Sequence, residues 1–192
     1  MIKIGNDISR FSSYSCQPKT RRELEDIIEE RISKEGPNCD LNDIDVSLIT
    51  GMYWLFYKSS FNGNISNWNV SNVTDMSYMF KDSAFNGDIS NWNVSKVKNM
   101  YGMFNWSVFN QDISEWNVSN AKDMAGMFYK SKFNNNISNW NVSNVNDMSY
   151  MFYMSDFNKD ISKWKINENC NTTYMFLECP INKEFKPKVL PE

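Results

Sequence analysis

The sequence predicts an α/β solenoid. We expect a right-handed coil of about six repeats, with a parallel β-sheet on one face, short helical arcs on the other and a capping helix at its N-terminal end. Three observations favour this fold. A unit of 24 residues recurs, the apolar residues inside each unit change from strand-like to helix-like spacing, and a helix-forming segment precedes the first unit. With 192 residues, 41% of them hydrophobic, the chain is large and apolar enough to bury a core.

The repeat is visible as columns of apolar residues that recur every 24 positions. One column holds Phe61, Phe85, Phe109, Phe133 and Phe157, and the Trp column holds Trp68, Trp92, Trp116, Trp140 and Trp164. These columns define the units 61–84, 85–108, 109–132, 133–156 and 157–180, and a divergent unit precedes them at 37–60. We therefore predict a repeat region at 37–180, an N-terminal segment with the capping helix at 1–36, and a C-terminal cap or tail at 181–192.

The spacing of apolar residues within one unit predicts two kinds of local structure. Trp92 and Val94 are two positions apart, so both point to one side of a short strand. Val97, Met100 and Met103 are three positions apart, which is typical of one face of a helical turn. A Phe-Asn-Gly-Asp motif supplies the turn between successive units. Each unit is therefore predicted to be strand, corner, helical arc and turn.

A period of 24 residues is too short for the helix pairs of tetratricopeptide or HEAT repeats and fits a leucine-rich-repeat-like coil. The residues Ile89, Trp92 and Val94 also fit the L-x-x-L-x-L pattern of that class. The alternative is an all-strand parallel β-helix, which the spacing in the second half of the unit disfavours.

Residues 20–35 are predicted to form the capping helix. The helix begins at a capping box, because Thr20 is followed three positions later by Glu23. It ends before Gly36 and Pro37. Its apolar stripe consists of Leu24, Ile27, Ile28 and Ile32. Such a helix would cover the apolar end of the first coil.

The composition argues against several function classes. Histidine is absent, which removes the commonest general base and the commonest neutral metal ligand. No nucleophile–base constellation and no Gly-rich phosphate loop is visible, so we predict no enzyme, no catalytic or metal-binding residue and no cofactor. The net charge of −3 with mixed signs argues against nucleic acid as a partner.

The cysteines and the first residues of the chain indicate the cellular compartment in which the protein is expected. Cys16, Cys39, Cys170 and Cys179 are interpreted as buried thiols, with a Cys170–Cys179 bridge as the alternative in an oxidising compartment. The first residues lack the apolar core of a signal peptide, and no apolar run has the length of a membrane span. We therefore expect a cytoplasmic protein, with secretion or cell-surface display as the alternative if an upstream signal is missing.

The unit "FNGDISNWNVSKVKNMYGMF" at 85–104 resembles the repeats of the BspA-like, DUF285-type bacterial proteins, which belong among the leucine-rich-repeat solenoids. The segment "PKTRRELEDIIEERI", followed by "LNDIDVSLITGM", resembles the entry helix and first coil that often precede such repeats. The resemblance covers about residues 19–180. It implies a non-enzymatic protein, often exposed at the cell surface and associated with adhesion and protein binding.

Polar residues that flank the Trp column form the first candidate protein-binding surface, here called the Asn surface. If the Trp side chains point inward, their neighbours point outward, and stacked Asn side chains form hydrogen-bonded ladders. The Asn surface consists of Asn67, Asn69, Asn91, Asn93, Glu115, Asn117, Asn139, Asn141, Lys163 and Lys165. Four of these asparagines also open Asn-Val-Ser sequons, which we interpret as repeat copying.

The second candidate surface is aromatic. Trp106 occupies a column that is mostly charged in the other units, and an indole in such a place is typical of a binding hot spot. Tyr129 and Tyr153 fill the neighbouring column. The alternative is that these rings cover the coil edges as part of the core.

We therefore expect a non-catalytic protein-binding repeat module with an unidentified protein as its partner. The sequence leaves the oligomeric state open, and a monomer is compatible with it. The alternatives are a small cytosolic inhibitor or immunity protein that blocks an enzyme, and an adhesin-like surface protein. A calcium- or carbohydrate-binding module ranks below these, because the aspartates lack the density of a calcium-binding repeat.

Overall fold

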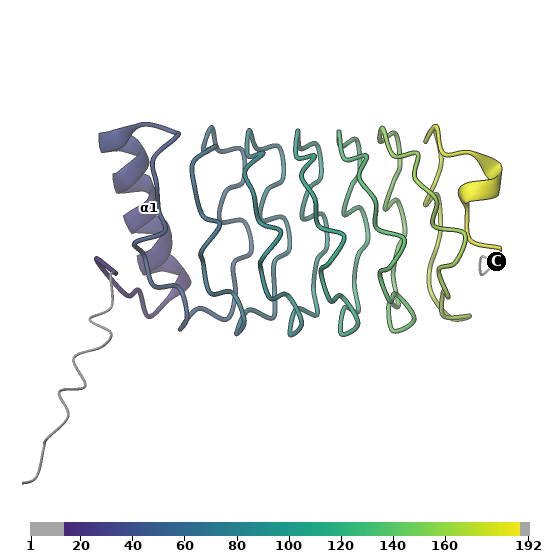
Figure 1. Cartoon of the computed structure of the whole chain (residues 1–192), viewed down its shortest axis with the longest axis horizontal. Coiled ribbons are helices and arrows are strands. Elements are labelled where there is room, and N and C mark those ends of the chain that lie inside the picture. Colours follow the sequence, from purple (N-terminus) through teal and green to yellow (C-terminus); the bar gives the residue numbers. More distant parts are fainter. Residues whose placement is uncertain (1–13, 189–192) are drawn as a thin grey trace, which may run out of the picture.

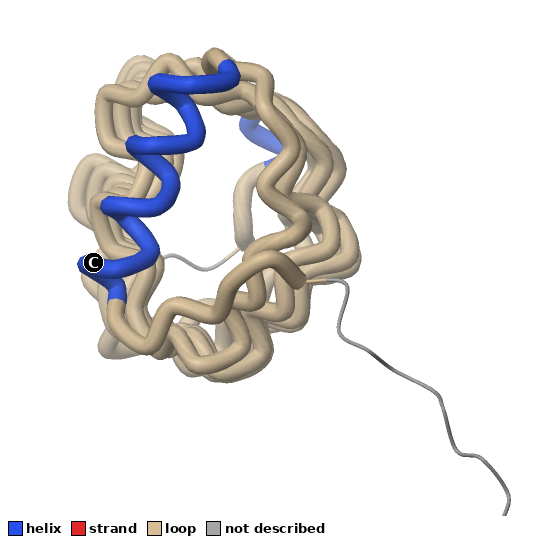
Figure 2. The backbone as a smooth tube through the Cα atoms, turned by 90° about the vertical axis from the view of Figure 1, so that its left-hand side faces the viewer, coloured by secondary structure: helices blue, strands red, loops and turns tan. Residues whose placement is uncertain are grey.

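The computed structural model describes residues 14–188, which wind into a stack of coils along one axis (Figure 1). Helix α1, Arg21–Glu35, lies at one end of the stack, and the 3-10 helix η1, Lys183–Phe185, lies at the other. Viewed along the axis, the coils follow one another as rings, and α1 lies across the end of the stack (Figure 2). The buried Phe, Trp and Met columns form one continuous core inside these rings.

The prediction of an α/β fold with a parallel β-sheet and short helical arcs is wrong. Residues 14–188 contain α1 and η1 but no β-strand. Successive coils are joined by isolated parallel bridges between residues 24 apart, such as Asp75 with Asn99 and Asn99 with Asp123. The segments predicted as strand and as helical arc are both built from turns.

These turns explain the spacing of the apolar residues. The N–H group of Trp92 donates to the carbonyl of Ile89 at 3.1 Å, and the N–H group of Met103 donates to the carbonyl of Met100 at 3.1 Å. The first and last residues of both turns are buried. A spacing of three therefore places both ends of a β-turn inside the coil, and no helix is needed to produce it.

Residues with positive φ prevent these turns from continuing as helices. The third residue of one turn is Gly102, with a φ of 59°, and the third residue of the next turn is Trp106, with a φ of 57°. A left-handed residue interrupts the right-handed dihedrals that a helix requires. The equivalent residues of other coils also have positive φ: Trp54, Tyr78, Gly126, Tyr150 and Tyr174 in the first column, and Lys58, Asp82, Lys130, Met154 and Glu178 in the second.

Backbone hydrogen bonds join the coils through the half that the sequence assigned to a helical arc. Every second N–H group donates to the following coil: Met76 to Asn99 (2.9 Å), Tyr78 to Tyr101 (2.8 Å) and Phe80 to Met103 (2.9 Å). Within this segment all these bonds point toward the C-terminal end of the stack. A strand in a parallel sheet instead both donates to and accepts from the same neighbour. This one-directional ladder therefore replaces the predicted sheet.

The Trp column joins the coils through the other half. The Nε1 group of Trp92 donates to the carbonyl of Ile65 in the preceding coil at 3.1 Å, and Trp116 bonds Ile89 in the same way. The indole rings are buried, and those of Trp68 and Trp92 stack with their centroids 6.3 Å apart. Each Trp thus supplies core area and also satisfies a backbone carbonyl that has no strand partner.

Helix α1 occupies the residues at which the sequence predicts a capping helix. The hydroxyl of Thr20 accepts the N–H of Glu23, and Gly36, with a φ of 90°, donates its N–H to Ile32 at the other end. The buried side chains of Leu24 and Ile28 cover the apolar end of the first coil.

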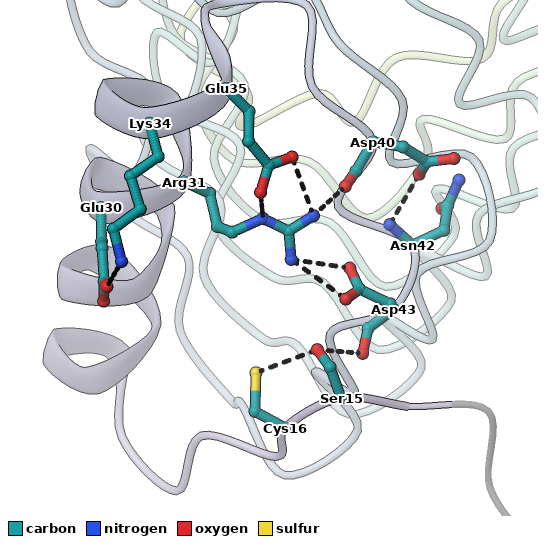
Figure 3. Close-up of polar contacts among 9 residues, drawn as sticks. All are labelled: Ser15, Cys16, Glu30, Arg31, Lys34, Glu35, Asp40, Asn42 and Asp43. Atoms are coloured by element: carbon teal, nitrogen blue, oxygen red, sulfur yellow. Dashed lines mark hydrogen bonds and ion pairs between the residues drawn. The ribbon is translucent and has the colours of Figure 1, made fainter.

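Arg31 fastens α1 to the first coil (Figure 3). Its Nη1 atom lies 3.0 Å from Oδ2 of Asp43, and Nη2 donates to the carbonyl of Asp40 at 2.8 Å. Its Nε atom pairs with Glu35 of the same helix at 2.6 Å. Hydrogen bonds from Ser15 and then from Arg31 lower the pKa of Asp43, which keeps this carboxylate charged.

Candidate functional site

The ten residues of the Asn surface are all exposed, beside the buried Trp column. The Asn ladder predicted for this surface is formed elsewhere. Oδ1 of Asn93 accepts the N–H of Ser95 within its own coil at 3.1 Å, and the equivalent asparagines at 69, 117 and 141 make the same bond. These side chains therefore close a local turn and do not join neighbouring coils.

A ladder of asparagines does occur in the Phe-Asn motif. The N–H group of Asn86 donates to Oδ1 of Asn62 at 2.8 Å, and Asn110 bonds Asn86 in the same way. The bond continues through Asn134, Asn158 and Asn182. The recurrence of Asn directly after each Phe was the sequence signal for this ladder, but it fits a turn equally well.

The Asn surface ends in two basic residues, Lys163 and Lys165, and this end borders a hollow of about 350 Å³. Asn139 and Lys163 line it together with Asn136, Lys159 and Asp160. The hollow has polar walls with charges of both signs, so its lining favours neither an anion nor a cation strongly.

The aromatic face is a band of ten exposed or half-buried rings on the half of the coils that carries the positive-φ residues. It consists of Tyr53, Trp54, Tyr57, Tyr78, Tyr101, Trp106, Tyr129, Tyr150, Tyr153 and Tyr174. The turns position these rings, because the Met and Phe residues beside them point into the core. Neighbouring rings contact one another, for example Trp54 with Tyr78 at 4.3 Å and Tyr150 with Tyr174 at 5.2 Å between centroids.

Trp106, the residue that the sequence singled out, is 53% exposed within this face. The ammonium group of Lys130 lies 4.4 Å from its ring centroid, as in a cation–π contact. Tyr129 and Tyr153 are half-buried and stack on each other with centroids 5.0 Å apart. The structure thus places all three predicted residues on one face, with Lys130 over both Trp106 and Tyr129.

The aromatic face contains a hollow of about 440 Å³ that the sequence analysis missed. Asp123 and Asp147 lie in it, and Tyr101, Tyr129 and Tyr150 line it. Burial raises the pKa of Asp123, and the negative charges of nearby Asp147 and Asp75 raise it further. The sequence signal was Ala125-Gly126, where neighbouring units carry a Tyr in one of the two positions.

Neither surface offers a set of metal ligands. In the described part of the chain, no group of three Cys, Asp or Glu side chains lies close enough to hold a metal ion. The cysteines at 16, 39, 170 and 179 are free thiols. Burial raises the pKa of Cys170 to about 11, and burial also raises that of Cys179, so neither sulfur has the thiolate character of a nucleophile.

The described residues also contain no helix with the length and apolar character that a membrane crossing requires. A family model, "Mycoplasma protein of unknown function, DUF285", matches this chain twice, over residues 29–132 and 105–187. Comparison with curated proteins and with solved structures found no match.

Proposed function

This chain belongs to the family described as "Mycoplasma protein of unknown function, DUF285", and from its surface we propose that it is a non-catalytic protein-binding module that acts through the aromatic face. The observation that carries this proposal is that exposed and half-buried rings from successive coils gather on one face. Isolated exposed apolar side chains are ordinary on a protein surface, whereas aromatic rings gathered on one face are typical of an interaction site.

Trp106 is the best candidate for the centre of such an interface. It is the most exposed of the face's Trp rings, and its column holds Lys, Asp, Met or Glu in the other coils. A core role would require burial, as in the Trp column. Its exposure therefore favours recognition over packing, since Trp is enriched among binding hot spots.

The Asn surface is the second candidate surface, and it is supported by its exposure alone. Four of its asparagines, at 69, 93, 117 and 141, already accept the backbone N–H of the residue two positions later. Their remaining amide groups are free to face solvent, but the surface lacks the large rings that dominate binding energy.

The test is capture of partners from the source cell with the immobilised chain, followed by mass spectrometry. The Trp106→Ala variant is compared with Met154→Ala, which truncates the same column two coils away. We expect Trp106→Ala to weaken capture about 30-fold, the effect of losing a hot spot, and Met154→Ala to weaken it little. A second variant carries both Asn93→Lys and Asn117→Lys. If folded Trp106→Ala captures the partner as before and this double variant does not, binding belongs to the Asn surface.

Two narrower roles remain proposals within this class. A small cytosolic inhibitor or immunity protein would use the aromatic face to cover an enzyme, and an adhesin-like protein would use it at the cell surface. Fractionation of the native protein separates them, because an adhesin must be found outside the cytosol. A melting temperature unchanged by calcium would remove a calcium-binding role.

A further inference from the structure

The hollow in the aromatic face exists because one coil lacks an aromatic side chain at both positions 125 and 126. Position 126 is Gly, where four other coils have Trp54, Tyr78, Tyr150 or Tyr174; Gly102 shares the column but follows Tyr101, whereas Gly126 follows Ala125. The ring contacts that run along the face from Trp54 to Tyr101 and from Tyr150 to Tyr174 do not cross this gap. Tyr101 of the preceding coil and Tyr150 of the following coil are left as walls.

The floor of the hollow carries two acidic residues from neighbouring coils. Oδ1 of Asp123 accepts the N–H of Ala125 at 2.9 Å, and Oδ1 of Asp147 accepts that of Ser149 at 2.8 Å. Elsewhere in this column an Asn stands next to an Asp and donates a hydrogen bond to its carboxylate, as Nδ2 of Asn99 does to Oδ2 of Asp75 at 3.3 Å.

Asp123 and Asp147 are adjacent in the column without an intervening Asn. Oδ2 of Asp147 accepts from Asn171 at 3.2 Å, but Oδ2 of Asp123 has no hydrogen-bond partner among residues 14–188. No Lys or Arg of the described chain forms an ion pair with either carboxylate; Lys130 lies instead over Trp106. The hollow therefore presents negative charge that nothing in the described chain compensates.

The carboxylates on the floor of the hollow and the tyrosine rings in its walls determine which class of ligand it can bind. An anion is repelled by Asp123 and Asp147, and a divalent metal ion finds too few ligands in the described residues. An organic cation is favoured by both groups, because it pairs with a carboxylate and lies against the electron-rich faces of aromatic rings. The volume of about 440 Å³ is ample for a Lys or Arg side chain.

We propose that the hollow bounded by Asp123, Asp147, Tyr101, Tyr129 and Tyr150 is the specificity pocket of the aromatic face and receives a Lys or Arg side chain of the protein partner. This inference rests on the proposed protein-binding function and adds the chemistry of the partner. The partner is basic where it meets this coil, and the ammonium or guanidinium group lies against the unpaired Oδ2 of Asp123.

The pocket is tested without the partner, by NMR titration of the full chain with butylammonium chloride and, in parallel, with neutral butanol. We expect the amides of Ala125 and Gly126 to shift with a dissociation constant on the order of 1 mM for the cation and to stay unmoved by butanol. A tripeptide with central Lys and blocked ends is expected to bind more tightly than butylammonium. A tripeptide that binds no better overturns the assignment to a partner's side chain.

Two variants and a matched control locate the site. Asp123→Asn is expected to weaken cation binding at least about threefold, whereas Asp75→Asn, in the same column but outside the hollow, leaves it unchanged. Gly126→Tyr is expected to abolish binding by filling the hollow while keeping both carboxylates. That variant should fold, because Tyr78 and Tyr150 have similar positive φ and a Cβ at 126 meets its nearest atom at 3.6 Å.

This inference is overturned if folded Gly126→Tyr still binds the cation. It is also overturned if Asp123→Asn and Asp75→Asn bind the cation equally well. These outcomes are independent of the proposed function, which depends on the effect of Trp106→Ala on partner capture. If Trp106→Ala abolishes capture while butylammonium does not bind, the face is a protein-binding surface and the hollow is not its cation pocket.

Discussion

At the scale of single residues, the polar side chains of the repeat stabilise its turns. Asp88 and Asn93 each accept the N–H of the residue two positions later, at 2.9 and 3.1 Å, and so precede the turns that begin at Ile89 and Val94. A coil without strands or helices must satisfy its backbone in this way, because buried N–H and C=O groups without partners are costly. The recurrence of Asp and Asn in each unit is therefore a structural requirement of the turns.

Asp123 accepts the N–H of Ala125 in the same way, but its partly buried charge should cost stability. Its pKa is raised in the folded state, so the folded chain binds a proton more tightly than the unfolded chain does. The cost is absent below the ordinary pKa of Asp, near 4, and appears as the pH rises through the raised value. We expect Asp123→Asn to increase the free energy of unfolding at pH 7 by up to about 1 kcal/mol and to change it little at pH 3.

Urea denaturation at the two pH values measures this difference, with Asp75→Asn as the control in the same column. A stabilised Asp123→Asn variant that also loses cation binding would show that the charge is retained for function at a cost in stability. If wild type and Asp123→Asn have the same free energy of unfolding at pH 7, the charge of Asp123 does not destabilise the folded chain.

At the scale of the structural element, the coil depends on two left-handed residues in successive turns. A non-glycine residue in this conformation costs on the order of 1 kcal/mol, so the stacking of the coils must outweigh the strain. Gly102 and Gly126 share the same φ of 59° but differ in their surroundings. A Cβ at Gly102 would lie 2.5 Å from the Tyr78 ring, whereas one at Gly126 meets Asn105 at 3.6 Å.

We therefore expect Gly102→Ala to destabilise the chain by roughly 2 kcal/mol, and Gly126→Ala by about 1 kcal/mol or less, because only the first adds a steric clash to the backbone strain. Thermal unfolding followed by circular dichroism compares the two variants directly. Equal losses in the two variants would mean that backbone strain, and not the contact with Tyr78, sets the cost.

At the scale of the whole molecule, the stack should tolerate the removal of an entire coil. Deleting residues 85–108 joins units whose columns stay in register, so the shorter chain should fold with a lower urea midpoint and a loss of roughly a few kcal/mol. Deleting 85–96 removes half a coil and moves apolar residues to the outside, so cooperative unfolding should disappear. Similar melting curves for the two deletions would contradict a stack of equivalent coils.

The period of this molecule and its capping helix could be predicted from its sequence, but the secondary structure of the coils could not. Columns such as Trp68 to Trp164 recur at 24 residues, and the bridges of the structure join residues 24 apart. A spacing of three, as from Met100 to Met103, arises equally from a helical turn and from a β-turn whose ends are both buried. The alternation of Gly102 and Gly126 with Tyr in one column was the available hint of positive φ.

The candidate site was predictable to a similar degree. Trp106, Tyr129 and Tyr153 could be identified because they interrupt or extend a repeating column, and such departures are visible in one sequence. The hollow beside them was not predicted, because it arises where Ala125 and Gly126 lack the large side chains of the neighbouring coils. Its acidic floor also depends on which Asp and Asn residues become neighbours after folding.

Along the segment that contains Met76, Tyr78 and Phe80, the one-directional hydrogen bonds between coils make the two ends of the stack chemical opposites. The first coil presents carbonyl acceptors, and the guanidinium of Arg21 donates to one of them, Tyr53, at 3.0 Å. The last coil presents the equivalent N–H groups of Tyr174, Phe176 and Glu178, beyond which no further coil follows within residues 14–188. Along this segment a cap for the first end must therefore supply donors and a cap for the second must supply acceptors, so the two caps cannot be exchanged.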